Sequence, residues 1–430
     1  MNKDKFYNLH GLINRESKMN ITAYNNSNIA FQSGQTKILS DFDGTFMPKE
    51  FNHDVICNDN PPVDKNAFNS YFDEFSRLLS PEDENGETEL AVSTGRNLFE
   101  FNYYMKKIKE KGLKIPVPDK LIITNGGDEF IKNPKSEYFS SNRENMFNEN
   151  DFNPKKQKYL RKFVINWDGY KIKNRVKSFI SRLQGCPVLL EPSTHQGMYG
   201  YRGDMTLQED IQKLPEEDKT NYISLRRDGN SLIRLTAPAQ SPYVEELKGL
   251  KKELEQDGFQ IDFQVKENND ETFVNSASTS NNWQMGTSIE IKPKTRGKVK
   301  TLDKYHHAKL MVDDIMQNNL DDLVIVCGDG KNDLDMLDLS NYIDSKSINP
   351  GDEEFKKEIS KLPLRAIFVR NSSNLDSKLA QMEKDFNFDG KKRFIIVDKD
   401  DESNPHTLIE AIKLAKDDYS SQNPRFKKEQ

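Results

Sequence analysis

The segment DFDGT, residues 41–45, contains two aspartates, Asp41 and Asp43, directly after a short predicted strand at residues 37–40. Residues two apart on an extended chain point to the same side, and ligands of open parallel sheets bind beyond the carboxyl ends of the strands. One carboxylate could attack a phosphorus atom to form an aspartyl phosphate, while the other donates and then removes a proton. By itself the pattern is weak, because an acidic turn with glycine is equally often a solvated loop.

A second acidic segment, GDGKND at residues 328–333, follows the apolar run 323–327. If the two runs are adjacent parallel strands, Asp329 and Asp333 come beside Asp41 and form the kind of oxygen site that Mg²⁺ prefers. A calcium-binding EF-hand loop is excluded, since it needs Asp or Asn at its third position and Gly at its sixth. This chain has Lys331 and Leu334 there.

Two further segments carry groups suited to phosphate. The sequence STGR, residues 93–96, ends another predicted strand, and Gly297-Lys298 stands where a helix is predicted to begin. The Thr94 hydroxyl and nearby backbone N–H groups could hold phosphate oxygens, and a lysine ammonium offsets their charge. Each segment alone is more often structural or solvated. Their occurrence in order, each at a strand end or helix start, favours a single site.

The elements around these segments predict an α/β fold with a doubly wound parallel sheet. Short apolar runs alternate with helical periodicity from residue 37 onward, as expected for strands joined by crossover helices. The predicted strands are at residues 37–40, 89–93, 120–124, 323–328, 366–371 and 393–399, and helical stripes cover 68–79, 98–108, a segment beginning near 302, and 375–386.

The pattern changes between Asp128 and Ser288, which indicates an inserted α+β domain. This stretch predicts helices at 174–183 and 243–254 and strands at 222–226, 232–237 and 259–265. The following strand, SIEIKPK at 288–294, is assigned to the returning core. The predicted domains are a polar extension at 1–36, a core at 37–130 and 288–418, the insert at 131–287, and a tail at 419–430.

The ordered set resembles the motifs of the haloacid dehalogenase (HAD) superfamily of phosphohydrolases, from about Lys37 to the C-terminal helix. DFDGT resembles its first motif, Thr94 its second, Lys298 its third and GDGKND its fourth. The resemblance implies that Asp41 is the nucleophile and Asp43 the general acid/base. It also implies a Mg²⁺ cofactor and a phosphoryl site, whose ligands and supporting residues would be Asp41, the Asp43 carbonyl, Asp329, Asn332 and Asp333 for the metal, and Thr94, Gly95 and Lys298 for the phosphoryl group.

The position of the insert resembles that of type C2 caps. AVSTGRN, PDKLIITNGGDEF, NYISLRRDG and IEIKPKTRGK are similar to segments of the sucrose-phosphate phosphatase-like group and its Cof-type relatives, although Glu290 stands where that group often has Asp. The resemblance implies a Mg²⁺-dependent phosphomonoesterase acting on a small sugar phosphate or related phosphorylated metabolite. A sugar phosphomutase and a non-catalytic binding protein on the same scaffold are the alternatives.

Two other patterns, the string GGDEF and a pair of histidines, are interpreted as having no catalytic or metal-binding role. Residues 126–130 spell GGDEF, the motif of diguanylate cyclases, but the chain lacks the upstream metal-binding Asp and FKxxND-like segment of that family, so cyclase activity is rejected. His306 and His307 are neighbours on a predicted helix and point about 100° apart, which does not suit a shared metal. They are predicted to be solvated.

Composition narrows the classes of partner. The 430-residue chain has 63 Lys and Arg against 69 Asp and Glu, a net charge of −6, which offers no broad positive surface for nucleic acid. Its three cysteines lack CxxC spacing, so neither a disulfide framework nor a zinc site is expected. The first residues have no apolar signal region and the longest apolar runs are strand-sized. We therefore expect a cytoplasmic protein without a membrane partner.

Overall fold

The computed structural model of this chain describes residues that belong to the compact unit Ser33–Gln430. They are 35–59, 61–80, 88–96, 98–124, 126–131, 163–183, 185–186, 188–190, 215, 222–228, 231–238, 241–267, 285–318, 320–343, 349–371 and 375–422. The predicted extension at 1–36 lies almost wholly outside these residues. The described chain enters its first strand at Thr36.

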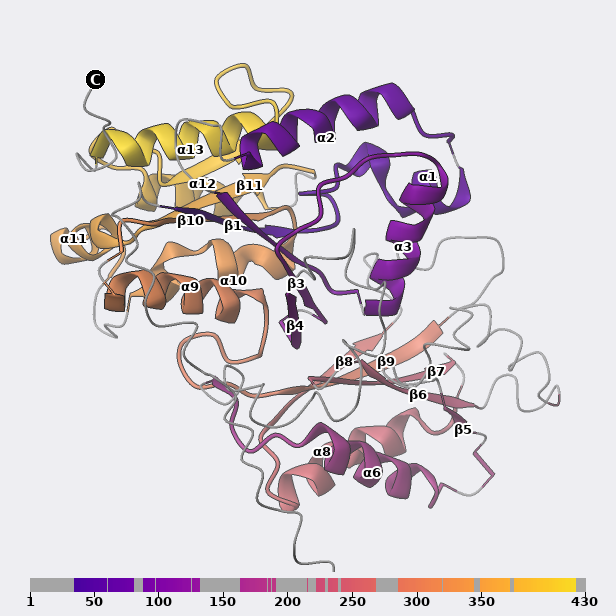
Figure 1. Cartoon of the computed structure of the whole chain (residues 1–430). Helices are drawn as coiled ribbons and strands as arrows, with labels where there is room; N and C mark the ends of the chain where they lie inside the picture. The colour runs from indigo at the N-terminus through magenta and orange to yellow at the C-terminus, as the bar shows by residue number, and fades with distance from the viewer. Residues whose placement is uncertain are drawn as a thin grey trace, which may run out of the picture. The chain divides into compact units, whose positions relative to one another are not determined.

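A seven-stranded sheet, predominantly parallel, is the larger of two sheets (Figure 1). Its order is β12-β11-β10-β1-β2-β3-β4, and only β4 runs antiparallel to its neighbour. The chain leaves β1 toward β2 and β3, and later extends the sheet in the other direction from β10. The strands are β1 Thr36–Asp41, β2 Thr88–Ser93, β3 Lys120–Ile123, β4 Asp128–Ile131, β10 Leu323–Gly328, β11 Leu364–Val369 and β12 Phe394–Val397.

Helices cover both faces of this sheet, as the apolar runs predict. Consecutive residues of β1 are buried on opposite faces: Ile38 packs in one cluster and Leu39 in the other. The Ile38 face is covered by α1 His53–Asn58, α2 Lys65–Leu79, α3 Leu98–Glu110 and α13 Leu408–Gln422. The Leu39 face is covered by α9 Lys304–Asn318, α10 Leu334–Leu337, α11 Glu353–Lys361 and α12 Asp376–Phe386. Short 3-10 turns are η1 Lys49–Phe51, η4 Lys331–Asp333 and η5 Leu339–Tyr342. The predicted α/β architecture is thus confirmed.

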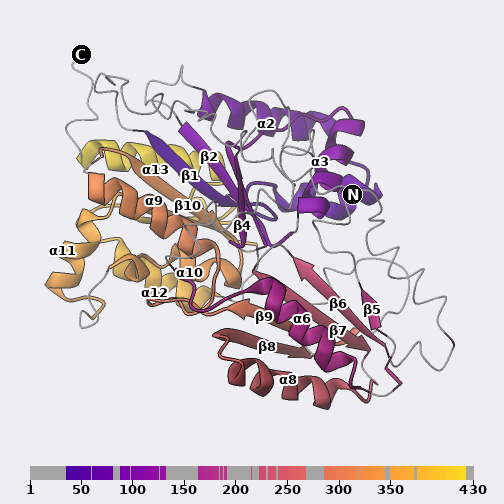
Figure 2. The same ribbon diagram turned by 60° about the horizontal axis from the view of Figure 1, so that its bottom comes forward.

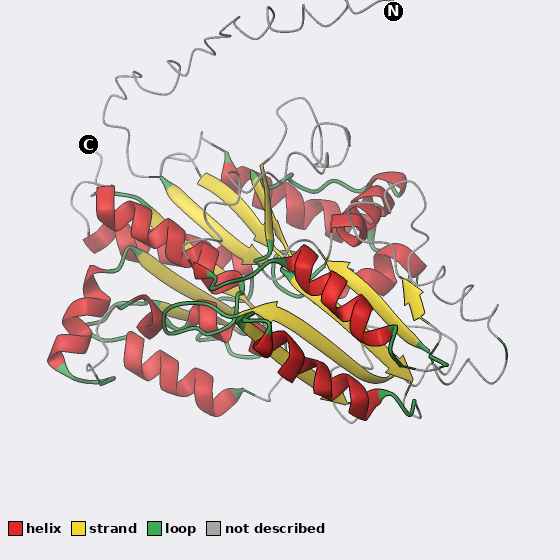
Figure 3. Cartoon of the chain, turned by 90° about the horizontal axis from the view of Figure 1, so that it is seen from below, coloured by secondary structure: helices red, strands yellow, loops and turns green. Residues whose placement is uncertain are grey.

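The chain segment that follows β4 and precedes α9 in the sequence forms a five-stranded sheet, with α6 and α8 on one of its faces (Figures 2 and 3). Its order is β5-β6-β7-β9-β8, and all its pairings except β5 with β6 are antiparallel. The elements are α6 Gly169–Ile180, β5 Val188–Leu190, β6 Ile223–Asp228, β7 Leu232–Pro238, α8 Val244–Gln256, β8 Ile261–Glu267 and β9 Met285–Pro293. The predicted α+β content of this stretch is present.

Strand β9 corrects one predicted boundary. Residues 288–294 were expected to return to the core, but β9 lies between β7 and β8 in the five-stranded sheet. Ile289 and Ile291 pack in the cluster beneath α6 and α8, while Ser288 and Glu290 alternate with them. Such alternation is typical of a sheet with one apolar face, whereas core strands are apolar at consecutive positions. The core sheet resumes only after this strand.

The C-terminal boundary also moves. Residues 419–430 were predicted to be a frayed tail, but α13 continues to Gln422. The Tyr419 hydroxyl donates to the carbonyl of Asp322 at 3.2 Å, and Asp418 accepts from Arg365 at 2.9 Å and 3.1 Å. Both contacts hold the last turns of α13 to the sheet. Only 423–430 lie beyond the described residues.

Cys57 and Cys186 are half-buried and Cys327 is buried, and none of the three forms a disulfide. Among the described helices, none has the length and apolar character that a membrane crossing requires.

The Arg365–Asp418 pair generates a stability prediction. The two side chains are only 2% and 10% exposed, so Asp418→Leu leaves a buried guanidinium without its counter-ion. We expect the free energy of unfolding to fall by about 3 kcal/mol in urea titrations. The double variant Arg365→Met/Asp418→Leu should lose less than the single one, because no unpaired charge remains.

Lys413→Met is the control, since Lys413 lies on α13 as Asp418 does and bonds Glu74 of α2 in an exposed pair. It should change the free energy of unfolding by less than about 0.5 kcal/mol. A loss in Asp418→Leu no larger than in this control would contradict the stabilising role of the buried pair.

Candidate active site

Three of the predicted site residues lie where neighbouring parallel strands end. Asp41 is the last residue of β1, Thr94 follows β2, and Asp329 follows β10. The register aligns Ser40 with Cys327 and Asp41 with Ser93, so these ends lie side by side. Because the strand order reverses at β1 and β10, this edge is where open α/β sheets form their ligand crevice.

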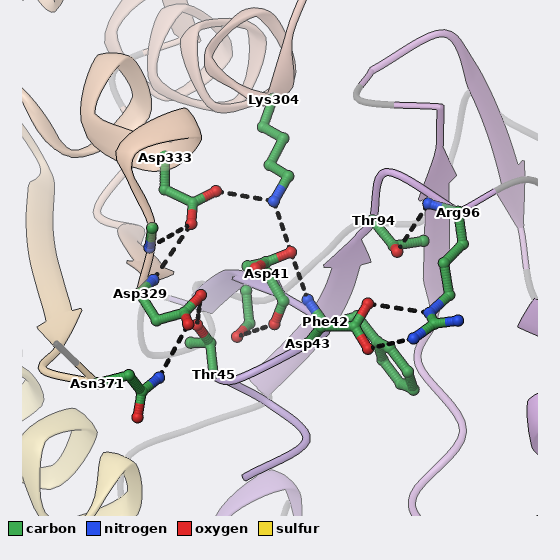
Figure 4. A network of polar contacts seen from close by, with 12 residues as sticks. Asp41, Phe42, Asp43, Thr45, Thr94, Arg96, Lys304, Asp329, Asp333 and Asn371 are labelled. Atoms are coloured by element: carbon green, nitrogen blue, oxygen red, sulfur yellow. Dashed lines mark hydrogen bonds and ion pairs between the residues drawn. The ribbon is translucent and has the colours of Figure 1, made fainter. Parts of the chain in front are cut away.

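Three carboxylates form a compact group at this edge (Figure 4). One oxygen each of Asp41, Asp329 and Asp333 lies within 4.8 Å of the others, and Asp41 and Asp333 are buried. Carboxylate oxygens are hard donors of the type that Mg²⁺ and Ca²⁺ select. Asp333, predicted as a supporting residue, is thus a full member of the group. Asn332 is exposed on the turn η4.

Backbone and side-chain donors hold two of these carboxylates in place. Asp333 Oδ2 accepts from the backbone N–H groups of Asp329 at 3.2 Å and Gly330 at 3.0 Å. Asp329 accepts from Asn371 Nδ2 at 2.8 Å and from the Thr45 hydroxyl at 3.3 Å. The sequence assigned no role to Asn371 or to Thr45, the last residue of DFDGT. Their position just past a strand end, which also marks the aspartates, is the signal that could have identified them.

Gly44 is required by the same packing. Its φ is +79°, and a Cβ at this position would lie 2.2 Å from Asp329 Oδ2. A side chain here would therefore displace Asp329 from its place beside Asp41.

The lysine of the site is Lys304, which corrects the prediction for Lys298. Lys304 Nζ donates to Asp41 Oδ1 at 2.5 Å and to Asp333 Oδ1 at 2.7 Å, and its side chain is 2% exposed. Lys298 is exposed, and its Nζ donates to the carbonyl of Ser340 at 2.8 Å. The physical reason is the start of the helix: Gly297 lies in a bend with φ +101°, and α9 begins only at Lys304.

Burial and mutual repulsion set the ionisation of the group. Burial raises the pKa of Asp41 well above its ordinary value; the Lys304 ammonium opposes this shift, and the carboxylates of Asp333 and Asp329 add to it. Burial also raises the pKa of Asp329, against the effect of the Asn371 hydrogen bond. For Lys304, burial lowers the pKa, but Asp333 and Asp41 together outweigh it and raise the pKa. One ammonium among three carboxylates leaves negative charge that a divalent cation would offset.

Asp43 and Thr94 form a second part of the site. The Asp43 side chain points away from the three carboxylates and pairs with Arg96, at 2.7 Å and 2.9 Å (Figure 4). The Thr94 side chain is buried, and its Oγ1 accepts from the backbone N–H of Arg96 at 3.1 Å. Gly95 between them is exposed. Arg96 therefore links the turn after β2, which carries Thr94, to the turn after β1, which carries Asp43, a role that the sequence did not assign to it.

The GGDEF string is a turn followed by β4, and it packs against the start of α9. Gly126 has φ +97°, and a Cβ there would lie 2.5 Å from the carbonyl oxygen of Asp303. His307 Nε2 lies 3.2 Å from the carbonyl oxygen of Gly126. The prediction that His306 and His307 are solvated is wrong: they are 1% and 3% exposed, because α9 is enclosed on several sides at its first turn.

No protein-family model matches this sequence, and no similar sequence was found among curated proteins. Any function must therefore be inferred from the site itself, above all from the three carboxylates and Lys304.

The two lysines generate a direct test of the site. Lys304→Met removes a positive charge that competes for Asp41 and Asp333, so we expect Mg²⁺ to bind roughly tenfold more tightly in isothermal titration calorimetry. Lys298→Met should leave the Mg²⁺ dissociation constant unchanged, since the Lys298 ammonium donates to the Ser340 carbonyl and not to the carboxylates. Circular dichroism of both variants controls for folding. Tighter binding in Lys298→Met, with none in Lys304→Met, would show that the site uses the other lysine.

Proposed function

We propose that this protein is a Mg²⁺-dependent phosphomonoesterase that works through an aspartyl phosphate, in the manner of the HAD superfamily. The observation that carries the proposal is the group of Asp41, Asp329 and Asp333 with Lys304 at the carboxyl ends of parallel strands, in which only Asp329 is not fully buried. A nucleophilic carboxylate needs nearby positive charge before it can approach a phosphate, because the two anions repel each other. Lys304 and a metal site beside Asp41 meet that need.

The donor set fits a magnesium ion. Asp41, Asp329 and Asp333 supply oxygen ligands only, and the Asp43 backbone carbonyl is the further ligand that we propose. A bound Mg²⁺ would offset the negative charge of the phosphoryl group and of the carboxylates around it. The raised pKa values of Asp41 and Asp329 support a site that is completed by a cation, since burial otherwise disfavours their ionised forms.

Asp41 is held for attack by its own contacts. Its Oδ1 accepts from Lys304 and from the backbone N–H of Phe42, the latter at 2.8 Å. This fixes the carboxylate and makes Oδ2 the candidate nucleophile. Attack on phosphorus forms the Asp41–phosphate bond and breaks the bond to the leaving alkoxide, which Asp43 protonates. Asp43 then takes a proton from the water that attacks the phosphorus, which releases phosphate and regenerates Asp41.

The five-stranded sheet is the proposed cap, and a small sugar phosphate is the proposed class of substrate. The support is the polar character of the sheet face opposite α6 and α8. There, Arg234 bonds Glu290 at 3.1 Å, and the hydroxyls of Ser224 and Thr236 lie 2.6 Å apart. Such groups suit a hydroxylated leaving group better than an apolar one.

Asp41→Asn tests the nucleophile. The side chains are nearly isosteric, so the fold should persist while Mg²⁺-dependent release of phosphate from an aryl phosphate falls by more than about a thousandfold. Phosphate release is measured colorimetrically, with urea titration as the control for folding. Substantial remaining activity in this variant would contradict the assignment of Asp41 as the nucleophile.

Asp43→Asn tests the general base separately. An aryl phosphate has a leaving group that needs little protonation, so the phosphoenzyme should still form in a rapid burst. Its hydrolysis should slow by about 10² to 10⁴-fold, because no base activates the water. Stopped-flow detection of the aryl alcohol, with acid-quenched phosphoenzyme, reports both steps. A burst that slows as much as the steady state would place Asp43 in the first step instead.

A further inference from the structure

Arg96 holds both oxygens of the Asp43 carboxylate. Its Nε donates to Oδ2 at 2.9 Å and its Nη2 to Oδ1 at 2.7 Å. The Asp43 side chain is 45% exposed and that of Arg96 22% exposed, so the pair lies at the mouth of the site rather than in the core. A single-point ion pair at such exposure would leave the carboxylate free to rotate. The planar two-point geometry fixes its orientation.

Arg96 is itself held by two backbone hydrogen bonds and by a contact of its guanidinium. The backbone N–H of Arg96 donates to Thr94 Oγ1 at 3.1 Å, and its carbonyl accepts from the N–H of Thr124 at 3.0 Å. Its guanidinium carbon lies 5.4 Å from the centroid of the Tyr104 ring, and the Tyr104 hydroxyl donates to the carbonyl of Phe51 at 2.6 Å. Arg96 is thus anchored to the ends of β2 and β3 and to α3.

We propose that Arg96 is a positioning residue, which sets the orientation of Asp43 for the hydrolysis of the phosphoenzyme. This role rests on the proposed function. Each Asp43 oxygen gives one lone pair to Arg96 and keeps another, so the carboxylate can still accept a proton from water. The alternative for an arginine near a phosphate site is direct binding of the phosphoryl group. The geometry favours the first role, because two of the guanidinium N–H groups are aimed at Asp43.

Arg96→Met and Arg96→Lys separate the two roles in a stopped-flow assay with an aryl phosphate and Mg²⁺. If Arg96 orients Asp43, the burst that reports phosphoenzyme formation keeps its rate and its dependence on substrate concentration. The steady-state rate falls about 10 to 100-fold, and acid-quenched phosphoenzyme accumulates. Lysine keeps the charge but not the two-point geometry, so Arg96→Lys should behave like Arg96→Met.

Arg182 provides a matched control. It bonds the Glu253 carboxylate at 2.6 Å and 2.8 Å and lies 5.2 Å from the Phe179 ring centroid, far along the chain from the site residues. Arg182→Met also removes an arginine–carboxylate pair, one made by Nη2 alone, and should leave both kinetic phases unchanged. In the Asp43→Asn background, Arg96→Met should cause no further slowing, since the group that it orients is already inactive.

The contrary outcomes are distinct. A burst that is slower and saturates only at higher substrate concentration would show that Arg96 binds the phosphoryl group. Full activity in Arg96→Lys would show that the positive charge alone suffices. Unchanged kinetics in Arg96→Met would remove any role for the pair. A wild-type protein that neither forms phosphoenzyme nor releases phosphate would overturn the proposed function itself, whatever the variants do.

Discussion

The site depends on one buried ammonium placed between two buried carboxylates. Lys304 bonds Asp41 and Asp333 at once, and these side chains come from α9, β1 and the turn after β10. Buried charges are tolerated only when they are paired, and removing one partner of such a group typically costs about 3 to 5 kcal/mol. The contacts therefore tie three segments, distant in sequence, into one arrangement. The negative charge that remains makes the same group a candidate for a cation.

Topology determines why this group forms at this edge. Parallel strands place their carboxyl ends together, and the strand order reverses between β1, which ends at Asp41, and β10, which Asp329 follows. Close backbone approaches complete the arrangement. Gly44 gives Asp329 room, and Gly126 lets the chain before α9 approach the turn after β3, which brings Lys304 over the sheet. This close approach accounts for Gly126, the first glycine of the GGDEF string.

The sequence predicts the strand ends well and the helix start poorly. Apolar runs followed directly by Asp41, Thr94 or Asp329 define the strand ends, because burial on both faces makes core strands apolar throughout. The choice between Lys298 and Lys304 depends on where α9 begins, and periodicity does not determine the first turn of a helix. In β9, polar and apolar residues alternate, which distinguishes this strand from the core strands, where consecutive residues are apolar. The difference is visible only if the polar residues are considered together with the apolar ones. The Arg96–Asp43 pair depends on side-chain directions that no spacing specifies.

The most direct measurement is the location of the covalent phosphate. Protein mixed with Mg²⁺ and an aryl phosphate is acid-quenched, reduced with borohydride to mark acyl phosphates, and mapped by peptide mass spectrometry. We predict that the modification lies on Asp41, at higher occupancy when hydrolysis of the intermediate is slowed. Turnover without any modified aspartate, or a modification on Asp329 or Asp333, would contradict it.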